Sequence, residues 1–120
     1  MAFEAMFQPI QIGKLTIRNR VLSTAHAEVY ATDGGMTTER YVKYYEEKAK
    51  GGIGLAICGG SSVVAIDSPQ EWWSSVNLST DRIIPHFQNL ADAMHKHGAK
   101  IMIQICLLYT SDAADEEDSV

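Results

Sequence analysis

The chain has 120 residues, of which 46% are hydrophobic and 21% charged, as in one globular domain with its own core. No apolar run approaches the ~20 residues of a membrane span, and the first residues lack the basic and apolar regions of a secretion signal. Two cysteines make no disulfide framework, so we expect a cytoplasmic protein. The net charge of −5 comes from residues 106–120, which hold five acids and no Lys or Arg. The balanced remainder argues against nucleic-acid or membrane binding.

The first predicted element is a β-hairpin near residues 8–18. Apolar and polar side chains alternate on both sides of Gly13-Lys14, and this pair suits a type II′ turn because glycine adopts positive φ readily. Residues 20–25 then predict a short strand.

The next predicted element is a helix that ends near Lys50. Thr37 or Thr38 can cap its start by accepting an orphan backbone N–H, and Gly51-Gly52 is typical of a helix end. Helical spacing places four apolar side chains on one face, namely Tyr41, Val42, Tyr45 and Ala49.

A second helix is predicted over residues 81–97. Ser79 or Thr80 is the expected cap, and Gly98 is the expected end. Its apolar stripe consists of Ile84, Phe87, Leu90, Ala91 and Met94.

The remaining segments predict strands and a loop. Residues 53–58 are uninterruptedly apolar, as in a strand buried on both faces, residues 61–78 predict a long loop, and residues 100–105 predict a third strand. The alternation of strands and helices indicates an α/β fold with parallel strands. It fits the opening of a (β/α)₈ TIM barrel or half of a doubly wound sheet, and the pattern alone does not distinguish these two architectures.

Ligands of α/β proteins bind at the carboxyl ends of the strands, where residues 24–27, residues 59–62 and Gln104 are expected to lie. The Gln104 amide both donates and accepts, so it can pair with the N–H and carbonyl of a flat heteroaromatic ring. Gly60 leaves room for close approach, and backbone N–H groups near Ala25 and His26 can meet a ring nitrogen. Alternatively, these are ordinary strand-end and turn residues.

Other candidate sites are weaker. Residues 59–62 lack the lysine that follows in a P-loop. His95 and His97 are two residues apart on a helix and point to different faces, which disfavours a shared metal. Cys58 is expected to be a small buried hydrophobe.

Six stretches together resemble the opening of the Old Yellow Enzyme superfamily of NADH:flavin oxidoreductases. They lie at 7–10 (Phe-Gln-Pro-Ile), 12–15 (Ile-Gly-Lys-Leu), 17–21 (Ile-Arg-Asn-Arg-Val), 44–52 (Tyr-Tyr-Glu-Glu-Lys-Ala-Lys-Gly-Gly), 59–60 (Gly-Gly) and 98–105 (Gly-Ala-Lys-Ile-Met-Ile-Gln-Ile). The likeness is strongest to the branch with 2,4-dienoyl-CoA reductase and trimethylamine dehydrogenase.

The resemblance implies an eight-stranded barrel with FMN at the carboxyl ends of the strands and the hairpin covering the barrel bottom. It assigns the first FMN contacts to Thr24, Ala25 and His26, and further contacts to Gly60 and Gln104. Gln104 would hydrogen-bond the flavin pyrimidine. Some members carry a cysteine at the position of Ala27, and in trimethylamine dehydrogenase it bonds the flavin covalently. The FMN is therefore expected to be noncovalent here.

The implied activity of the parent protein is FMN-dependent hydride transfer on a small-molecule substrate. Two alternatives stay open: an NAD(P)H:enoyl reductase, or a methylamine-type dehydrogenase/demethylase. Longer members of the branch add an iron–sulfur cluster and a second nucleotide-binding domain, for FAD, which this chain would lack.

We expect residues 1–105 to be a truncated FMN-binding barrel domain without its catalytic residues. Residues 106–120 resemble the translation of a transposase-type sequencing adapter, and a natural acidic tail is the alternative. The fragment by itself is then expected to be inactive and to bind no cofactor. An unrelated nucleotide-binding α/β domain would place a Gly-rich turn after the first strand, where residues 24–27 contain none.

Overall fold

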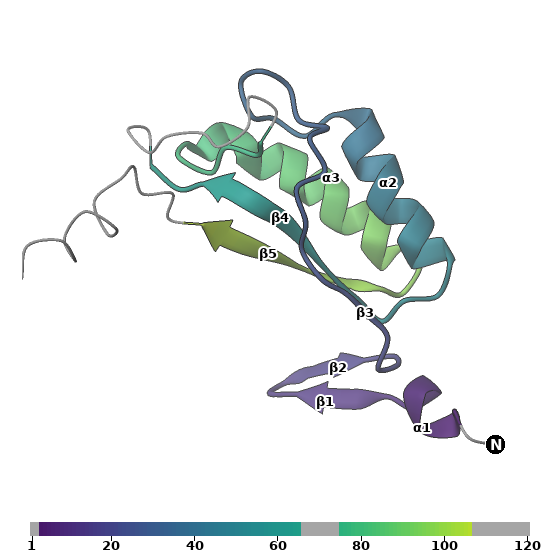
Figure 1. Ribbon diagram of the computed structural model, residues 1–120. Coiled ribbons are helices and arrows are strands. Elements are labelled where there is room, and N and C mark those ends of the chain that lie inside the picture. Colours follow the sequence, from purple (N-terminus) through teal and green to yellow (C-terminus); the bar gives the residue numbers. More distant parts are fainter. Residues whose placement is uncertain (1–2, 66–74, 107–120) are drawn as a thin grey trace, which may run out of the picture.

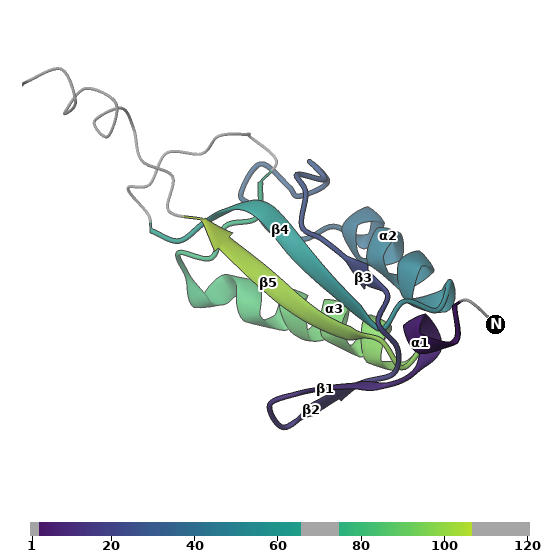
Figure 2. The ribbon, with the colours of Figure 1, turned by 60° about the horizontal axis from the view of Figure 1, so that its bottom comes forward.

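A computed structural model describes residues 3–65 and 75–106 and shows a hairpin beside a layer of strands and helices (Figure 1). The layer is a parallel sheet of order β3-β4-β5, and helices α2 and α3 pack on one of its faces. A short helix, α1 (Glu4–Phe7), precedes the hairpin. Figure 2 shows that the hairpin lies at the end of the sheet where the strands begin, as expected for the bottom of a barrel.

The hairpin agrees with the prediction. Strands β1 (Ile10–Ile12) and β2 (Leu15–Ile17) pair antiparallel with Ile12 opposite Leu15, so Gly13-Lys14 forms a two-residue turn. Gly13 has φ +58° and Lys14 has no positive φ, which is the pattern of the predicted type II′ turn.

The three parallel strands are also confirmed, with different bounds. Strand β3 (Leu22–Ser23) is shorter than predicted, whereas β4 (Leu55–Val63) continues into the segment predicted as a loop. Strand β5 (Lys100–Cys106) ends one residue beyond the predicted boundary of the barrel domain. The acidic tail itself, residues 107–120, lies outside the described residues.

Helix α2 (Glu39–Lys50) begins and ends as predicted. The Thr38 side chain caps it by accepting a hydrogen bond from the Tyr41 N–H at 3.2 Å, and Gly52 follows it with φ +98°. The four apolar residues predicted for one face are all buried.

The second helix differs from the prediction at its start, and it ends at His95, two residues before the predicted end at His97. A 3₁₀ turn, η1 (Asp81–Ile83), precedes α3 (Ile84–His95), and neither Ser79 nor Thr80 caps it with its side chain. Because a 3₁₀ turn winds three residues per turn, it changes which side chain faces the sheet. Ile83 is therefore buried, and Ile84, predicted for the core, is 60% exposed.

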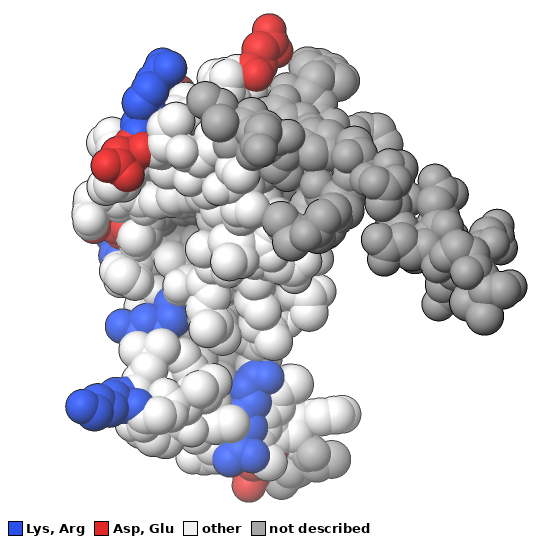
Figure 3. Space-filling model, turned by 90° about the vertical axis from the view of Figure 1, so that its left-hand side faces the viewer, with Lys and Arg blue, Asp and Glu red and all other residues white. Residues whose placement is uncertain are grey.

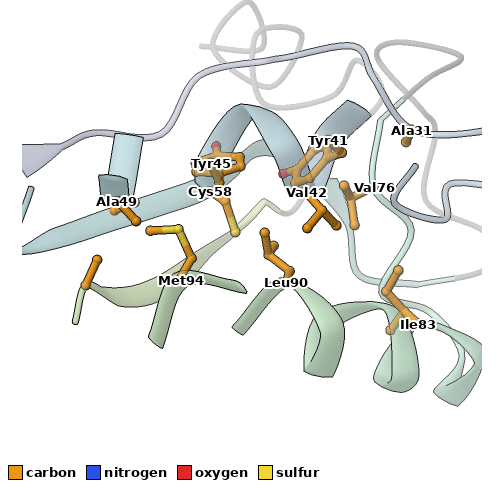
Figure 4. Close-up of a cluster of buried hydrophobic side chains, with 12 residues drawn as sticks. Ala31, Tyr41, Val42, Tyr45, Ala49, Cys58, Val76, Ile83, Leu90 and Met94 are labelled. Carbon is orange, nitrogen blue, oxygen red and sulfur yellow. The ribbon is translucent and has the colours of Figure 1, made fainter. Parts of the chain in front are cut away.

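The core lies between the two long helices and β4 (Figure 4). Tyr41 and Tyr45 of α2 meet Leu90 and Met94 of α3 above Cys58 of β4, and each of these side chains is at most 1% exposed. This packing fixes both helices on one face of the sheet.

Arg18, directly after the hairpin, connects that hairpin to both helix ends. Its guanidinium donates to the Ile53 carbonyl at 2.7 and 3.0 Å, to the Ala49 carbonyl at 2.8 Å and to the His97 carbonyl at 2.5 Å. Ala49 lies in the last turn of α2, where its carbonyl also accepts from the Gly52 N–H at 3.0 Å, and Ile53 and His97 follow the two helices. The guanidinium thus supplies charged donors to carbonyls at the ends of both crossover connections.

We therefore predict that Arg18→Met lowers the free energy of unfolding by about 2–4 kcal/mol, because three carbonyls lose a charged donor. Urea denaturation of the chain measures this loss. Arg20→Met is the control, since the exposed Arg20 side chain has no hydrogen bond within the described residues. Equal effects of the two substitutions would contradict the role given to Arg18.

Candidate functional site

The carboxyl end of the sheet contains a bulge in β4 that the sequence does not predict. Cys58 lies opposite Ile103 and Ser62 lies opposite Ile105, so β4 uses two more residues than β5 over this stretch. Residues 59–62, predicted to follow the strand, therefore lie inside it. Bulges bend a strand and are frequent next to functional sites.

Gly59 is required by the shape of the bulge. Its φ is +78°, and a Cβ there would lie 2.3 Å from Ser62 Oγ. The Ser62 hydroxyl in turn donates to the Gly59 carbonyl at 2.9 Å, which closes the bulge.

Three of the five predicted site residues come together at this point. A Cβ on Gly60 would lie 2.9 Å from the His26 carbonyl carbon, and Gln104 Nε2 donates to the Gly60 carbonyl at 3.5 Å. Thr24 is exposed and follows β3 directly, and the half-buried Ala25 leads from it to His26. The strand ends therefore place all five along one edge, and their contact with a flavin stays a prediction.

Gln104 faces away from the helices. Ile101 packs against the core under α2 and α3, so the alternation of side chains along β5 places Met102 and Gln104 on the opposite face. Both are exposed, Met102 to 51%. An uncovered amide beside an apolar side chain suits the polar edge of a flat ring.

The His26 side chain contacts helix α2. Its Nε2 lies 2.8 Å from Tyr44 Oη, and the two rings meet edge to face with centroids 5.6 Å apart. The imidazole is thus hydrogen-bonded to Tyr44, which leaves the backbone of residues 24–26 and the exposed Thr24 side chain at the end of β3.

Polar groups beneath this segment are largely buried. The Glu28 carboxylate accepts a hydrogen bond from Tyr45 Oη, and burial raises the pKa of Glu28 above its usual range. Burial also raises the pKa of the Cys58 thiol to about 12 and the pKa of Tyr41 well above its usual range. Cys58 is therefore a protonated thiol near neutral pH, as expected for a small buried hydrophobe.

Figure 3 shows the molecule from the left of Figure 1, the side to which the carboxyl ends of β4 and β5 point. On this face, Lys and Arg side chains lie at the left and in the lower part, and Asp and Glu lie at the left, the top and the bottom, with uncharged residues between them in the described part. In residues 3–65 and 75–106, no group of three or more His, Cys, Asp or Glu could hold a metal, and no helix is long and apolar enough to cross a membrane.

Solved structures with the same fold are barrels of the Old Yellow Enzyme family. A 2-naphthoyl-CoA reductase in complex with 2-naphthoyl-CoA superposes with a TM-score of 0.80 and 27% identity, over 88% of this chain and 16% of that chain. The old yellow enzyme from Trypanosoma cruzi superposes with a TM-score of 0.76 and 26% identity, over 87% and 27%. The fold is thus part of a (β/α)₈ barrel, which settles the choice that the pattern left open.

The model of the NADH:flavin oxidoreductase / NADH oxidase family matches residues 5–119, and the chain belongs to this family. It is 86% identical over 105 residues to the N,N-dimethylglycine/sarcosine dehydrogenase of Chromohalobacter salexigens, which covers 88% of this chain and 15% of that protein. It is 43% identical over 102 residues to the multifunctional alkene reductase/demethylase OYE of Caballeronia cordobensis, over 85% and 15%. The chain thus spans about 15% of the length of these relatives.

The sequence alone did not predict that side chains of α2 hold the segment after β3. Tyr45 was predicted as a core residue and is one, but its hydroxyl also bonds Glu28. Tyr44 and Lys48 carried no prediction of their own, and Tyr44 bonds His26 while Lys48 Nζ donates to Ser23 Oγ at 2.9 Å. The only available signal was that these residues lie within a stretch resembling the family.

We predict that Gly60→Ala destabilises the fold by about 1–3 kcal/mol, because the new methyl group would press on the His26 backbone. Gly34→Ala is the control, because the backbone of Gly34 has no positive φ and a Cβ there would have its nearest neighbour at 3.9 Å. Thermal unfolding of both variants measures the difference. An unchanged melting temperature in Gly60→Ala would show that the segment is not packed against β4 in solution.

Proposed function

We propose that this chain is part of an FMN-dependent oxidoreductase that oxidises the N-methyl groups of small methylated amino acids. The carrying observation is the 86% identity over 105 residues to an N,N-dimethylglycine/sarcosine dehydrogenase. A probable N-methylproline demethylase of Rhizobium meliloti, 38% identical over 118 residues, supports the same chemistry. Enoyl reduction is the second candidate, supported by the fold shared with 2-naphthoyl-CoA reductase at 27% identity.

The residues at the carboxyl end of the sheet fit FMN. When bound, FMN supplies a two-electron acceptor for a hydride. Gln104 has an exposed amide that can donate and accept along the polar edge of the pyrimidine ring. The backbone of Thr24, Ala25 and His26 can line the ring beside Gly60. Ala27 offers no thiol, so the flavin is held noncovalently.

Further groups would act through parts of a longer protein. Oxidation of a methylated amine delivers electrons to the flavin from the substrate itself, whereas enoyl reduction takes them from NAD(P)H. An iron–sulfur cluster and FAD are proposed as electron acceptors. They would bind to the remaining 85% or so of a protein as long as the relatives, outside the residues of this chain. Such a protein is proposed to act in the cytoplasm.

The proposed activity is tested on the longer gene product, obtained by sequencing the source DNA past the codon for Ile105. The purified protein, supplied with an artificial electron acceptor that reoxidises the flavin, is expected to release formaldehyde from dimethylglycine or sarcosine, because water hydrolyses the oxidised N-methyl group to formaldehyde and the demethylated amine. The parallel assay offers an enoyl-CoA with NADH or NADPH. Turnover of the enoyl-CoA without oxidation of either methylated amine would favour the second candidate instead.

The 120-residue chain alone is expected to bind FMN with a dissociation constant weaker than about 1 mM. A barrel usually binds phosphate through the loops after its seventh and eighth strands, and the described residues supply three parallel strands. A few hydrogen bonds of ~1 kcal/mol each do not offset the cost of immobilising the ligand, about 4 kcal/mol or more. Quenching of flavin fluorescence measures the affinity, and a micromolar constant would contradict this expectation.

A further inference from the structure

The segment that follows β3 is held by side chains of helix α2. Residues 24–30 have no strand pairing among the described residues. Lys48 Nζ donates to Ser23 Oγ at 2.9 Å, Tyr44 Oη lies 2.8 Å from His26 Nε2, and Tyr45 Oη donates to Glu28. One helix thus bonds the last residue of β3 and two residues of the segment that follows it.

The opposite side of the same segment lies against the bulge in β4. A Cβ on Gly60 would come within 2.9 Å of the His26 carbonyl carbon and 3.2 Å of the Ala27 nitrogen. The backbone is therefore confined between α2 and β4, and its path is fixed by contacts on both sides.

The three α2 side chains form one cluster. The Lys48 ammonium lies 4.4 Å from the Tyr44 ring centroid and 5.0 Å from that of Tyr45, and the two rings meet edge to face at 5.4 Å. Cations are attracted to the faces of aromatic rings, so Lys48 stabilises the tyrosine pair in addition to its hydrogen bond to Ser23. Tyr45 is fully buried, and its hydroxyl donates to Glu28.

The backbone next to the last anchor is strained. Val29, directly after Glu28, has φ +56°, a conformation that β-branched residues rarely adopt. Such a conformation persists only when its surroundings hold it, and strain of this kind gathers at ligand sites. Hydrogen bonds hold both neighbours of Val29: the Glu28 carboxylate accepts from Tyr45 Oη, and the Tyr30 carbonyl accepts from the Thr38 hydroxyl.

We propose that Tyr44, Tyr45 and Lys48 are positioning residues that preorganise the backbone of residues 24–26 for the flavin. This inference rests on the proposed function, because the role assigned to these residues is in binding FMN, which they are not proposed to contact themselves. A loop that is already ordered loses less conformational entropy when a ligand binds, so these anchors raise flavin affinity. They act from outside the barrel interior, through the segment.

The test uses the longer FMN-binding protein with Tyr45→Phe, Tyr44→Phe and Lys48→Met. Each variant is expected to raise the dissociation constant of FMN about tenfold, the effect of one lost hydrogen bond to a charged or ordered partner. The visible absorption of the bound flavin is expected to shift, because its backbone contacts loosen. Lys48→Arg is expected to restore most of the affinity, since it keeps a cationic donor.

Two control variants remove the same kinds of group without breaking a hydrogen bond to the segment; the residue changed in the first of them, Tyr30, is itself the last residue of the segment. Tyr30→Phe deletes a hydroxyl that has no hydrogen bond within the described residues, although its ring lies 5.8 Å from that of Tyr44. Lys43→Met deletes an exposed ammonium of α2 that makes no hydrogen bond there either. Both are expected to change flavin affinity less than twofold or so.

The outcomes separate this inference from the proposed function. A wild-type protein that binds no FMN overturns both. A wild-type protein that binds FMN, with variants that lose thermal stability yet keep its affinity and flavin spectrum, overturns the positioning role alone. If Tyr45→Phe does not fold, Tyr44→Phe decides, because its partner His26 is exposed.

Discussion

The guanidinium of Arg18 reaches the hairpin, the end of α2 and the turn after α3 from a single position. Its hydrogen bonds to the carbonyls of Ala49, Ile53 and His97 lie where both crossover connections enter their next strand. One rigid set of five N–H donors bonds these carbonyls together, at the end of α2 and in the turns before β4 and β5. The bottom of the sheet is thereby fixed, and the start points of β4 and β5 determine how their carboxyl ends align.

Alignment at the other end produces the site. Because the strands run parallel, the segment after β3, the bulge of β4 and Gln104 of β5 reach one edge, with Gly60 close to the His26 backbone on one side and to Gln104 on the other. The site offers backbone groups and one amide, with no ionised side chain among its proposed contacts. We propose that this arrangement binds and orients the neutral edge of the flavin ring, with the redox chemistry left to the cofactor.

Much of the fold and the positions of the site residues could be predicted because they depend on local patterns. The cap at Thr38 and the apolar face of α2 follow from spacing, and parallel strands bring their ends together whatever their lengths. The β4 bulge could not be predicted, since consecutive glycines and serines are also typical of a loop. Ile83 replaced Ile84 in the core because a 3₁₀ turn shifts the helical phase. The bonds from α2 to residues 23–28 depend on tertiary packing, which spacing does not encode.

We propose that flavin binds on the backbone of residues 24–26, while the side chains of Ser23, His26 and Glu28 bond to α2. A crystal structure of the longer protein with FMN tests this binding mode. We expect the Gln104 amide about 3 Å from the pyrimidine edge, the backbone of residues 24–26 along the ring, and the His26 imidazole still bonded to Tyr44. A flavin bound away from Gln104 and Gly60, or a His26 imidazole turned from Tyr44 onto the ring, would contradict it.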